Sequence, residues 1–271
     1  MNESKLNQVP TACVLACAGP VLNNTVSFTN IAFGWKIDVA RDQASKAHQR
    51  FCRHGYGILT VHPYEYIDEK APIASIGAGT ALGECFLTPG NDGQYSCFAS
   101  EGGHTDFAPS DEIEIELYNE IKAKLGCRKR FSVDRIVSGP GLATIYEFLA
   151  TKFPEKVDPK LHEKFLNANT QQGKVVGENS KTNVLCTRRR DFHSWQCDAK
   201  VPASWWILHH WWSYTQESGL FYQEGHFLDS LFDKGRVNLA LRACPIYLVL
   251  TEELGEHGAH FYAFPLLQSG A

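Results

Sequence analysis

The sequence predicts an α/β fold on two observations. Short apolar segments typical of strands alternate with segments of helical periodicity, and glycine-rich turns separate them. The alternation is clearest from residue 73 to residue 153. The chain has 271 residues, of which 44% are hydrophobic and 21% charged, so one large domain or two small ones can form a packed core.

The predicted strands are short runs of apolar or alternating residues that end at glycine, proline or asparagine. An Asn-Asn turn at residues 23–24 precedes the second strand, and a Gly-Asn-Asp-Gly turn at residues 90–93 follows the fourth. In chain order, strands are predicted for residues 11–18, 25–28, 73–76, 84–87, 133–137 and 245–250.

Three segments are predicted to be helices. Residues 111–125 place apolar side chains at roughly helical spacing, with Ser110 as the expected N-cap. Residues 142–153 are apolar and follow a Gly-Pro-Gly turn at 139–141. Residues 254–264 carry spaced glycine and alanine, a small-residue face suited to close helix packing.

Charge and cysteine content narrow the class of protein. A formal net charge of −4 argues against a general binder of nucleic acid or of anionic membranes. No apolar run approaches the roughly 18 residues of a membrane-spanning helix. The nine cysteines include no Cys-x-x-Cys pair, and the polar start lacks a secretory pattern, so we expect reduced thiols in a cytoplasmic protein.

Tryptophan is distributed unusually. Five of the six tryptophans lie between residues 195 and 212, and they include two Trp-Trp pairs that flank Ile-Leu-His-His. A packed core spreads its tryptophans, so this cluster needs a cause of its own. One interpretation is an aromatic platform for carbohydrate. Another is a metal site of Cys186, His193, Cys197 and His209, although that spacing matches no recognised zinc motif.

The turn between the third and fourth predicted strands is Gly-Ala-Gly-Thr, residues 77–80. Glycines let backbone N–H groups approach an anion, and the hydroxyl of Thr80 adds a donor, so the turn suits phosphate oxygens. A simple hairpin has the same pattern, and the turn alone does not decide between the two interpretations.

A compact polar stretch follows at residues 100–107, Ser-Glu-Gly-Gly-His-Thr-Asp-Phe. Two acids and an imidazole beside two glycines suit a sugar site, because vicinal hydroxyls need rigidly held partners. A solvated loop is the alternative. The spacing of Glu101 and His104 fits neither helical metal ligands nor a zinc motif.

A third motif covers residues 132–141, Ser-Val-Asp-Arg-Ile-Val-Ser-Gly-Pro-Gly. It places Asp134 and Arg135 at a predicted strand that leads into a glycine turn and a helix. Ligands of open α/β sheets bind near such strand ends. A buried ion pair between Asp134 and Arg135 is the structural alternative.

Together the three motifs resemble the bacterial-type glucokinases, which are ATP-dependent hexose kinases of the hexokinase and actin-like ATPase superfamily. The resemblance implies an α/β, actin-like ATPase (ribonuclease H-like) kinase fold of two lobes. The fold is expected to be incomplete here, because the chain starts inside the family's first domain. Further matching segments are Ala-Gly-Pro-Val at 18–21, Phe-Thr-Asn at 28–30, Asp-Lys-Gly-Arg at 233–236 and Leu-Gly-Glu-His-Gly-Ala-His at 254–260.

The resemblance also implies a domain organisation. We expect a remnant of a small α/β domain at residues 1–66, a large α/β domain at 67–250 with an irregular stretch at 185–222, and a C-terminal helix at 251–271 that returns to the small domain. The cleft would take glucose and ATP, with Mg²⁺ as cofactor, and close on the sugar. No nucleic-acid or membrane partner is expected, and the sequence leaves a homodimer open.

Individual residues take roles from the same resemblance. Glu101 and His104 would exchange hydrogen bonds with glucose hydroxyls, and Asp134 stands where the family usually has a sugar-binding Glu. Asn30, in a matching segment, is also expected to bind substrate. Ala81 replaces a usual Gly, which would crowd the turn if a positive φ is needed there. The expected nucleotide-binding residues are Gly77, Gly79, Thr80 and Gly83.

Three family segments are absent from the chain as written. The family's opening Asp-x-Gly-Gly-Thr phosphate loop has no counterpart. Its general base is the Asp of an Asn-Asp-Phe-x-Ala segment, but residues 48–54 are His-Gln-Arg-Phe-Cys-Arg-His, with Arg50 near the base position. Its Gly-Gly-x-x-x-x-Gly-Gly segment near adenosine corresponds to residues 205–212, the run with both Trp-Trp pairs. No catalytic residue is therefore assigned.

A one-base shift of reading frame links two of these losses. Tryptophan has the single codon TGG, so a displaced Trp-Trp pair becomes Gly-Gly where the next base permits it. The same shift across residues 48–54 permits Ile-Asn-Asp-Phe-Val-Ala-Thr, which restores the base. We therefore interpret residues 41–54 and 187–222 as frameshifted, and the coding sequence across codons 40–60 and 184–224 tests this interpretation.

The functional prediction follows from the family resemblance and from the missing segments. The chain is expected to be a glucokinase-type kinase that converts ATP and D-glucose to ADP and glucose 6-phosphate at the entry to glycolysis. As written, it is expected to have impaired or no activity. A non-catalytic sugar-binding protein, or a decayed relative, is the alternative. The preferred hexose and the phosphate donor stay open.

Overall fold

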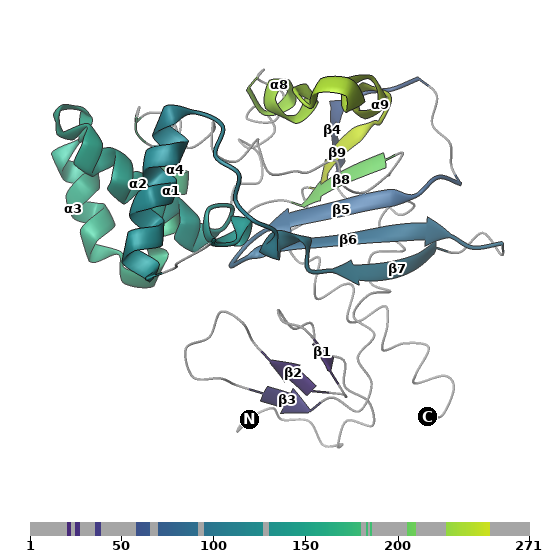
Figure 1. Cartoon of the computed structure of the whole chain (residues 1–271), viewed down its shortest axis with the longest axis horizontal. Coiled ribbons are helices and arrows are strands. Elements are labelled where there is room, and N and C mark those ends of the chain that lie inside the picture. The colour runs from purple at the N-terminus through teal and green to yellow at the C-terminus, as the bar shows by residue number, and fades with distance from the viewer. Residues whose placement is uncertain are drawn as a thin grey trace, which may run out of the picture.

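The structure is a computed structural model of the chain. It describes residues 21–22, 25–27, 36–38, 58–65, 70–91, 95–126, 130–179, 183, 185, 205–209 and 226–249. These residues form two β-sheets and several helices (Figure 1). The predicted α/β class is therefore confirmed.

The main sheet has six strands: β4 (Ile58–His62), β5 (Ile73–Ala78), β6 (Leu82–Pro89), β7 (Tyr95–Ser100), β8 (Trp205–His209) and β9 (Ile246–Val249). Their order across the sheet is β4-β9-β8-β5-β6-β7. Short turns join β5, β6 and β7 into an antiparallel meander. Strand β8 lies between β5 and β9 and is parallel to both, and such pairing requires long connections in the chain.

The strands predicted around residues 73–76, 84–87 and 245–250 are confirmed as β5, β6 and β9, with different ends. Strand β7 was not predicted, although a turn was predicted at residues 90–93, shortly before it. Tyr95, Cys97 and Ser100 of β7 are half-buried and its other residues are exposed, so this edge strand lacks the buried apolar run that marks β5. The strand predicted at residues 11–18 lies outside the described residues.

A second sheet has three strands, β1 (Val21–Leu22), β2 (Thr25–Ser27) and β3 (Lys36–Asp38), all antiparallel. The strand predicted at 25–28 is confirmed as β2. Strand β4, although it precedes residue 66, pairs with β9 in the main sheet. The division of the chain at residue 66 stays a prediction.

Helix α1 (Glu112–Leu125) begins at Asp111, whose Oδ1 accepts a hydrogen bond from the N–H of Glu114 at 2.7 Å. The prediction of Ser110 as N-cap is therefore wrong by one residue. The amide and hydroxyl of Ser110 instead donate to Oε2 of the buried Glu114, at 2.7 and 2.6 Å. This pairing resembles a capping box. The helix ends at Gly126, whose φ of 62° favours glycine.

Helix α2 (Gly139–Lys152) is the helix predicted at 142–153, begun earlier. Its N-cap is Ser138, whose Oγ accepts from the N–H of Gly141 at 3.1 Å. Pro140 sits in the first turn, where a missing N–H costs no helical hydrogen bond.

The strand predicted at residues 133–137 is wrong. Val133–Arg135 form a 3-10 turn, η3, in which the N–H groups of Ile136 and Val137 both donate to the carbonyl of Val133 at 2.9 Å. The apolar residues of this segment are buried all the same, so their hydrophobic character reflects burial rather than a strand. Asp134 is therefore presented by a tight turn.

Four further helices of the described residues had no prediction. Helices α3 (Pro159–Asn167) and α4 (Gln172–Glu178) gather with α1 and α2 at one end of the main sheet, while α8 (His226–Phe232) and α9 (Asn238–Arg242) lie beside β4 and β9 (Figure 1). The ring of His62 in β4 meets Phe232 edge-on at 4.9 Å, which fixes α8 against the sheet. The helix predicted at 254–264 lies outside the described residues.

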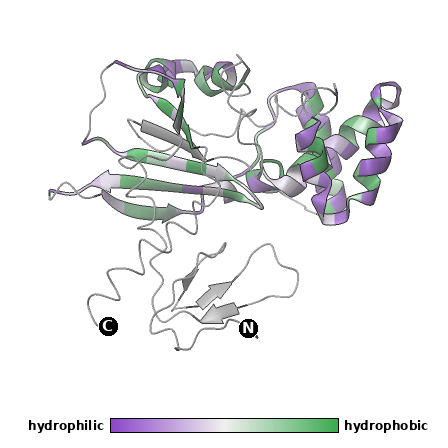
Figure 2. Cartoon of the chain, turned by 180° about the vertical axis from the view of Figure 1, so that it is seen from behind, coloured by the Kyte–Doolittle hydropathy of each residue, from purple (hydrophilic) through white to green (hydrophobic). Residues whose placement is uncertain are grey.

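One apolar cluster joins the main sheet to the helices. The helices show hydrophobic faces beside hydrophilic ones, as amphipathic helices on a core do (Figure 2). Burial of such side chains is the chief stabilising contribution to the fold. Its largest fully buried members include Tyr146, Ile145, Leu149, Phe165, Ile246 and Leu248.

Three cysteines of the described part are free thiols: Cys85, Cys97 and Cys244. A hydrogen bond with the Cys85 side chain on the neighbouring strand, together with burial, raises the pKa of the Cys97 thiol. A raised pKa keeps a thiol protonated and weakly nucleophilic. The Cys97 thiol is therefore expected to react slowly.

Candidate active site

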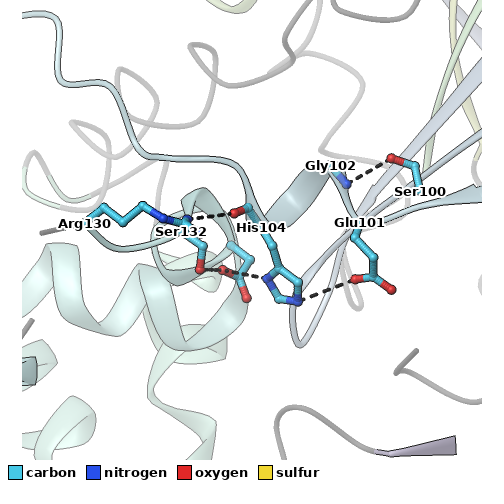
Figure 3. Close-up of polar contacts among 7 residues, drawn as sticks. Ser100, Glu101, Gly102, His104, Arg130 and Ser132 are labelled. Atoms are coloured by element: carbon cyan, nitrogen blue, oxygen red, sulfur yellow. Dashed lines mark hydrogen bonds and ion pairs between the residues drawn. The ribbon is translucent and has the colours of Figure 1, made fainter. Parts of the chain in front are cut away.

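A carboxylate and an imidazole come together where β7 ends. Glu101 follows β7 directly, and the 3-10 turn η2 (Gly102–His104) reverses the chain through a hydrogen bond from the N–H of His104 to the carbonyl of Glu101 at 3.0 Å. Nε2 of His104 then lies 3.6 Å from Oε2 of Glu101. Its Nδ1 lies 3.6 Å from Oδ1 of Asp134, which comes from η3. Figure 3 shows the imidazole of His104 between Glu101 on one side and Ser132 on the other. The imidazole stands between two carboxylates, and we call these three residues the acid–imidazole cluster.

The three side chains differ in burial. Those of Glu101 and His104 are 60% and 42% exposed, whereas that of Asp134 is 9% exposed. Asp134 accepts a hydrogen bond from the hydroxyl of Ser132 and does not pair with Arg135, which is exposed. The alternative of a buried ion pair between Asp134 and Arg135 is therefore wrong.

Two segments far apart in sequence are joined beneath the cluster. The N–H of Val133 donates to the carbonyl of Thr105 at 2.9 Å, and the N–H of Phe107 donates to the carbonyl of Phe131 at 3.1 Å. Arg130 adds a side-chain link, because its Nη1 lies 2.7 Å from Oδ1 of Asp106 and donates to the carbonyl of His104 at 3.2 Å. These contacts fix the position of η3 relative to η2.

The two glycines of η2 allow close packing against β6. A Cβ on Gly103 would lie 2.1 Å from the carbonyl oxygen of Leu82, and a Cβ on Gly102 would lie 1.9 Å from Oε2 of Glu84. The Leu82 oxygen belongs to the backbone, so only glycine fits at position 103, whereas the Glu84 carboxylate ends a flexible side chain and can turn away from position 102. The glycines predicted from the motif therefore serve the packing of the turn that carries His104.

Residues 77–83, which we call the glycine turn, connect β5 to β6. Gly77 pairs with Gly83 in the ladder, and the N–H of Gly79 donates to the carbonyl of Ala81 at 2.9 Å. The carbonyl of Gly79 accepts from the N–H of Gly139 at 2.8 Å, so the turn is anchored on the start of α2. Sequence reasoning missed this link, for which Gly-Pro-Gly after Ser138 is the available signal.

The glycine turn is open at its tip. A Cβ on Gly79 would meet nothing within 4 Å, and Thr80 is exposed. Among the described residues, the only non-glycine residue with positive φ is Asn169. Ala81 therefore does not need the left-handed conformation, and the crowding expected from this Gly-to-Ala difference is absent.

Strand β8 places the start of the tryptophan-rich run in the sheet. It pairs with β5 so that Trp205 lies opposite Ile73 and His209 lies opposite Gly77. Its end therefore reaches the level of the glycine turn.

Several predicted residues lie outside the described residues. They include Asn30, Arg50 at the expected base position, and three of the four residues of the alternative metal site. The part of the chain that the structure describes contains no group of three His, Cys, Asp or Glu side chains that could hold a metal ion. Within that part no helix combines the length and apolar character that crossing a membrane requires.

Comparison with known proteins decides the family. A family model described as glucokinase matches residues 57–187, which contain all three motifs. Glucokinase of Synechocystis sp. is 31% identical over 285 residues, covering 93% of this chain and 78% of the relative. The chain belongs to the glucokinase family. It is a glucokinase-type sugar kinase, as the motifs predicted.

Other relatives and solved structures agree with this assignment. Glucokinase of Nostoc sp. is 39% identical over 164 residues, 54% of this chain and 47% of the relative. Glucokinase of Balamuthia mandrillaris, solved in complex with glucose, superposes with a TM-score of 0.71 at 14% identity, covering 94% of this chain and 78% of that one. Glucokinase from an Antarctic psychrotroph superposes with a TM-score of 0.62 at 18% identity, covering 92% of this chain and 78% of that one. The fold is that of the actin-like ATPase kinases.

Proposed function

We propose that this chain binds glucose at the acid–imidazole cluster and nucleotide phosphates at the glycine turn. The observation that carries the proposal is that the two motifs touch. Gly103 packs on the carbonyl of Leu82, the residue at which the glycine turn enters β6. Phosphoryl transfer depends chiefly on positioning and charge stabilisation, so a kinase needs its sugar site beside its phosphate site.

The chemistry of the cluster fits a sugar. Ionised carboxylates accept hydrogen bonds from hydroxyls, and the imidazole can donate or accept according to its protonation. Glu101 and His104 are accessible from solvent, while the buried Asp134 supplies a fixed acceptor behind them. Vicinal hydroxyls of glucose would therefore meet acceptors from two segments.

The chemistry of the glycine turn fits phosphate oxygens. The first N–H groups of α2 are already used, since Gly139 donates to Gly79 and Gly141 donates to Ser138. The start of α2 therefore anchors the turn. The N–H of Gly79 is also used, since it donates to the carbonyl of Ala81, so phosphate contacts would come from other backbone N–H groups of the turn and from the Thr80 hydroxyl. The proposed nucleotide-binding residues are Gly77, Gly79, Thr80 and Gly83.

The proposed phosphate donor is ATP, with Mg²⁺ as cofactor. Mg²⁺ commonly binds through substrate phosphates, water and one or two carboxylates, and needs no dedicated cage of protein ligands. The glycine turn fits that mode, because it offers phosphate contacts without a cluster of metal ligands. When bound, the ion would neutralise charge on the phosphates.

We further propose that the chain as written has impaired or no kinase activity. Arg50 stands near the place of the family's general base, and a guanidinium cannot take the proton of the sugar hydroxyl. Loss of a general base typically costs about 10²–10⁴ in rate. The sugar cluster does not depend on that residue, so glucose binding without turnover is the second candidate function.

Other parts of the proposal rest on the family alone. Asn30 is proposed as a further substrate-binding residue. The small domain at 1–66, the large domain at 67–250 and the returning helix at 251–271 are proposed to enclose the cleft. The chain is also proposed to lie in the cytoplasm and to form a homodimer.

The test compares two full-length chains. One is the chain as given, and the other has residues 41–54 and 187–222 translated in the shifted frame. Glucose-dependent thermal stabilisation measures binding, with sorbitol at equal concentration as the control for non-specific effects. Saturation at about 100 times Kd adds about 2.7 kcal/mol of stability. A coupled assay for glucose 6-phosphate measures turnover.

We expect stabilisation by glucose but not by sorbitol in both chains. We expect turnover only in the shifted-frame chain, at a reduced rate, because the shifted frame does not restore the Asp-x-Gly-Gly-Thr phosphate loop. If glucose stabilises neither chain, the assignment of the sugar site is wrong. Ordinary turnover by the chain as given would refute the proposed loss of activity.

A further inference from the structure

Asp134 is the buried member of the acid–imidazole cluster, and a buried carboxylate needs hydrogen-bond donors to offset the loss of water. Its two contacts with the described part of the chain both fall on Oδ1. The hydroxyl of Ser132 donates to this oxygen, and Nδ1 of His104 faces it at 3.6 Å. Oδ2 is left without a contact from the described residues.

Ser132 is itself held firmly. It forms a β-bridge with Asp106, and its carbonyl accepts from the N–H of Arg135 at 3.2 Å. Ser132 is the N-cap residue of η3, yet its hydroxyl makes no capping bond to the backbone. The hydroxyl donates instead to Oδ1 of Asp134, two residues further along the chain.

We propose that Ser132 is a positioning residue for the sugar site, an inference that rests on the proposed function. Its hydroxyl fixes the Asp134 carboxylate so that Oδ1 orients the Nδ1 side of His104 and Oδ2 stays available to a sugar hydroxyl. The need for such a residue follows from the short side chain of Asp134. A carboxylate that stands one methylene nearer the backbone reaches less far, and it must be aimed to serve both the imidazole and the sugar.

A purely structural role for Ser132 makes different predictions. Removal of a hydroxyl that only stabilises the turn would lower the free energy of unfolding and leave the imidazole and the sugar affinity unchanged. In a positioning role, loss of the Ser132 hydroxyl weakens glucose binding only because it displaces the Asp134 carboxylate. The two roles can therefore be separated by a double-mutant cycle, which measures the coupling between residues.

The experiment uses the full chain with the variants Ser132→Ala, Ser132→Thr and Asp134→Asn, and the double variant S132A/D134N. Ser96→Ala, an exposed serine of β7, is the matched control. Glucose Kd is measured by calorimetry, and the ring nitrogens of His104 are followed by ¹⁵N NMR without sugar. We expect S132A to weaken glucose binding about fivefold, the worth of one hydrogen bond.

In the D134N background, S132A should change the glucose Kd by less than about twofold, because the group it positions is already altered. S132T should restore both the wild-type Kd and the His104 signals, and S96A should change neither. Equal glucose affinity in wild type and S132A, or an undiminished effect of S132A in D134N, would overturn the inference.

The NMR measurement keeps the two proposals apart. If the wild-type chain binds no glucose, the proposed function fails, and the His104 signals still decide the role of Ser132. Displaced signals in S132A that S132T restores support the positioning role. Signals identical in wild type and S132A refute it.

Discussion

The acid–imidazole cluster and the glycine turn are built by different means. In the cluster the decisive contacts join side chains: His104 faces Glu101 and Asp134, and Ser132 donates to Asp134. In the glycine turn they join backbone groups, as between Gly79 and Ala81 and between Gly139 and Gly79. In the acid–imidazole cluster, binding therefore depends on which side chains are present. In the glycine turn, it depends on the small size of glycine, which has no side chain.

The two regions meet where glycine is indispensable to the fold. Gly103 belongs to the cluster's turn η2 but packs on backbone that leads out of the glycine turn. A substitution there should affect folding, whereas substitutions of the cluster's side chains should affect binding alone. Single substitutions in each region can therefore separate effects on folding from effects on binding.

The largest effect is expected from Gly103→Ala. Its Cβ would lie 2.1 Å from the carbonyl oxygen of Leu82, a backbone atom that cannot turn aside. We expect a loss of about 3 kcal/mol in the free energy of unfolding, the upper range for an overpacked site. Urea denaturation measures it. Gly79→Ala is the matched control, since a Cβ there meets nothing within 4 Å. Equal stability of the two variants would contradict the close packing of η2 on β6.

Glu101→Gln is expected to lower binding without lowering stability. Its side chain is 60% exposed, so the fold does not depend on it. Hydrogen bonds to charged groups are worth about 1.5–3 kcal/mol, so the glucose Kd should rise about 10- to 100-fold. Calorimetric titration measures the Kd and thermal unfolding measures stability. Glu155→Gln, an exposed acid of the turn Pro154–Lys156, is the control and should change neither.

A drop in melting temperature of E101Q that matches its loss of affinity would show that Glu101 belongs to a structural network rather than to a binding surface. An unchanged Kd would remove Glu101 from the sugar site.

The parts of the fold that the sequence predicted are those with local signals. Strand β5 is a buried apolar run, and α2 follows a Ser-Gly-Pro-Gly start, so hydrophobicity and capping chemistry were sufficient. The strand predicted at 133–137 was wrong because burial from packing on helices looks the same in sequence as burial in a sheet. Strand β8 had no prediction, because tertiary pairing with β5 and β9 outweighs its unusual composition.

The candidate site was predicted in its residues but not in its connections. Glu101 and His104 are neighbours in sequence, and their proximity needed no tertiary information. The position of Asp134 beside His104 depends on hydrogen bonds between residues 105–107 and 131–133, which no local pattern encodes. The role of Ser132 was likewise invisible, because a serine before a turn most often caps the backbone.

Gly79→Ala is expected to have a moderate effect confined to nucleotide binding. The backbone at Gly79 does not have positive φ, and a methyl group would project into open space, so folding should be unchanged within about 0.5 kcal/mol. That open space is where the phosphates are proposed to lie. We expect the affinity for ATP to fall about fivefold, because the methyl group would occupy space proposed for the phosphates. ATP-dependent thermal stabilisation measures the change.

Two comparisons make the G79A result interpretable. Glucose affinity in G79A should equal that of the unmodified chain, because the cluster does not depend on the tip of the glycine turn. Unchanged ATP affinity would place the phosphates elsewhere.

The smallest effect is expected from Arg130→Ala, which removes the side-chain link between the two segments of the cluster. Arg130 and Asp106 are 57% and 64% exposed, and exposed ion pairs contribute about 0–1 kcal/mol. The backbone hydrogen bonds from Val133 and Phe107 would still join the segments. Glucose affinity should therefore change less than about twofold, and the change should shrink further in high salt.

Arg130→Lys separates charge from geometry in this prediction. Lysine keeps the positive charge, but a single ammonium is a poorer match than the planar guanidinium for bonding Asp106 and the His104 carbonyl together. If R130K behaves as wild type and R130A shows a small salt-dependent loss, the link is electrostatic and weak. A tenfold loss of glucose affinity in both variants would show that side-chain bonding, and not the backbone ladder, sets the distance between η2 and η3. In that case the cluster would rely on side-chain contacts for its support as well as for its chemistry.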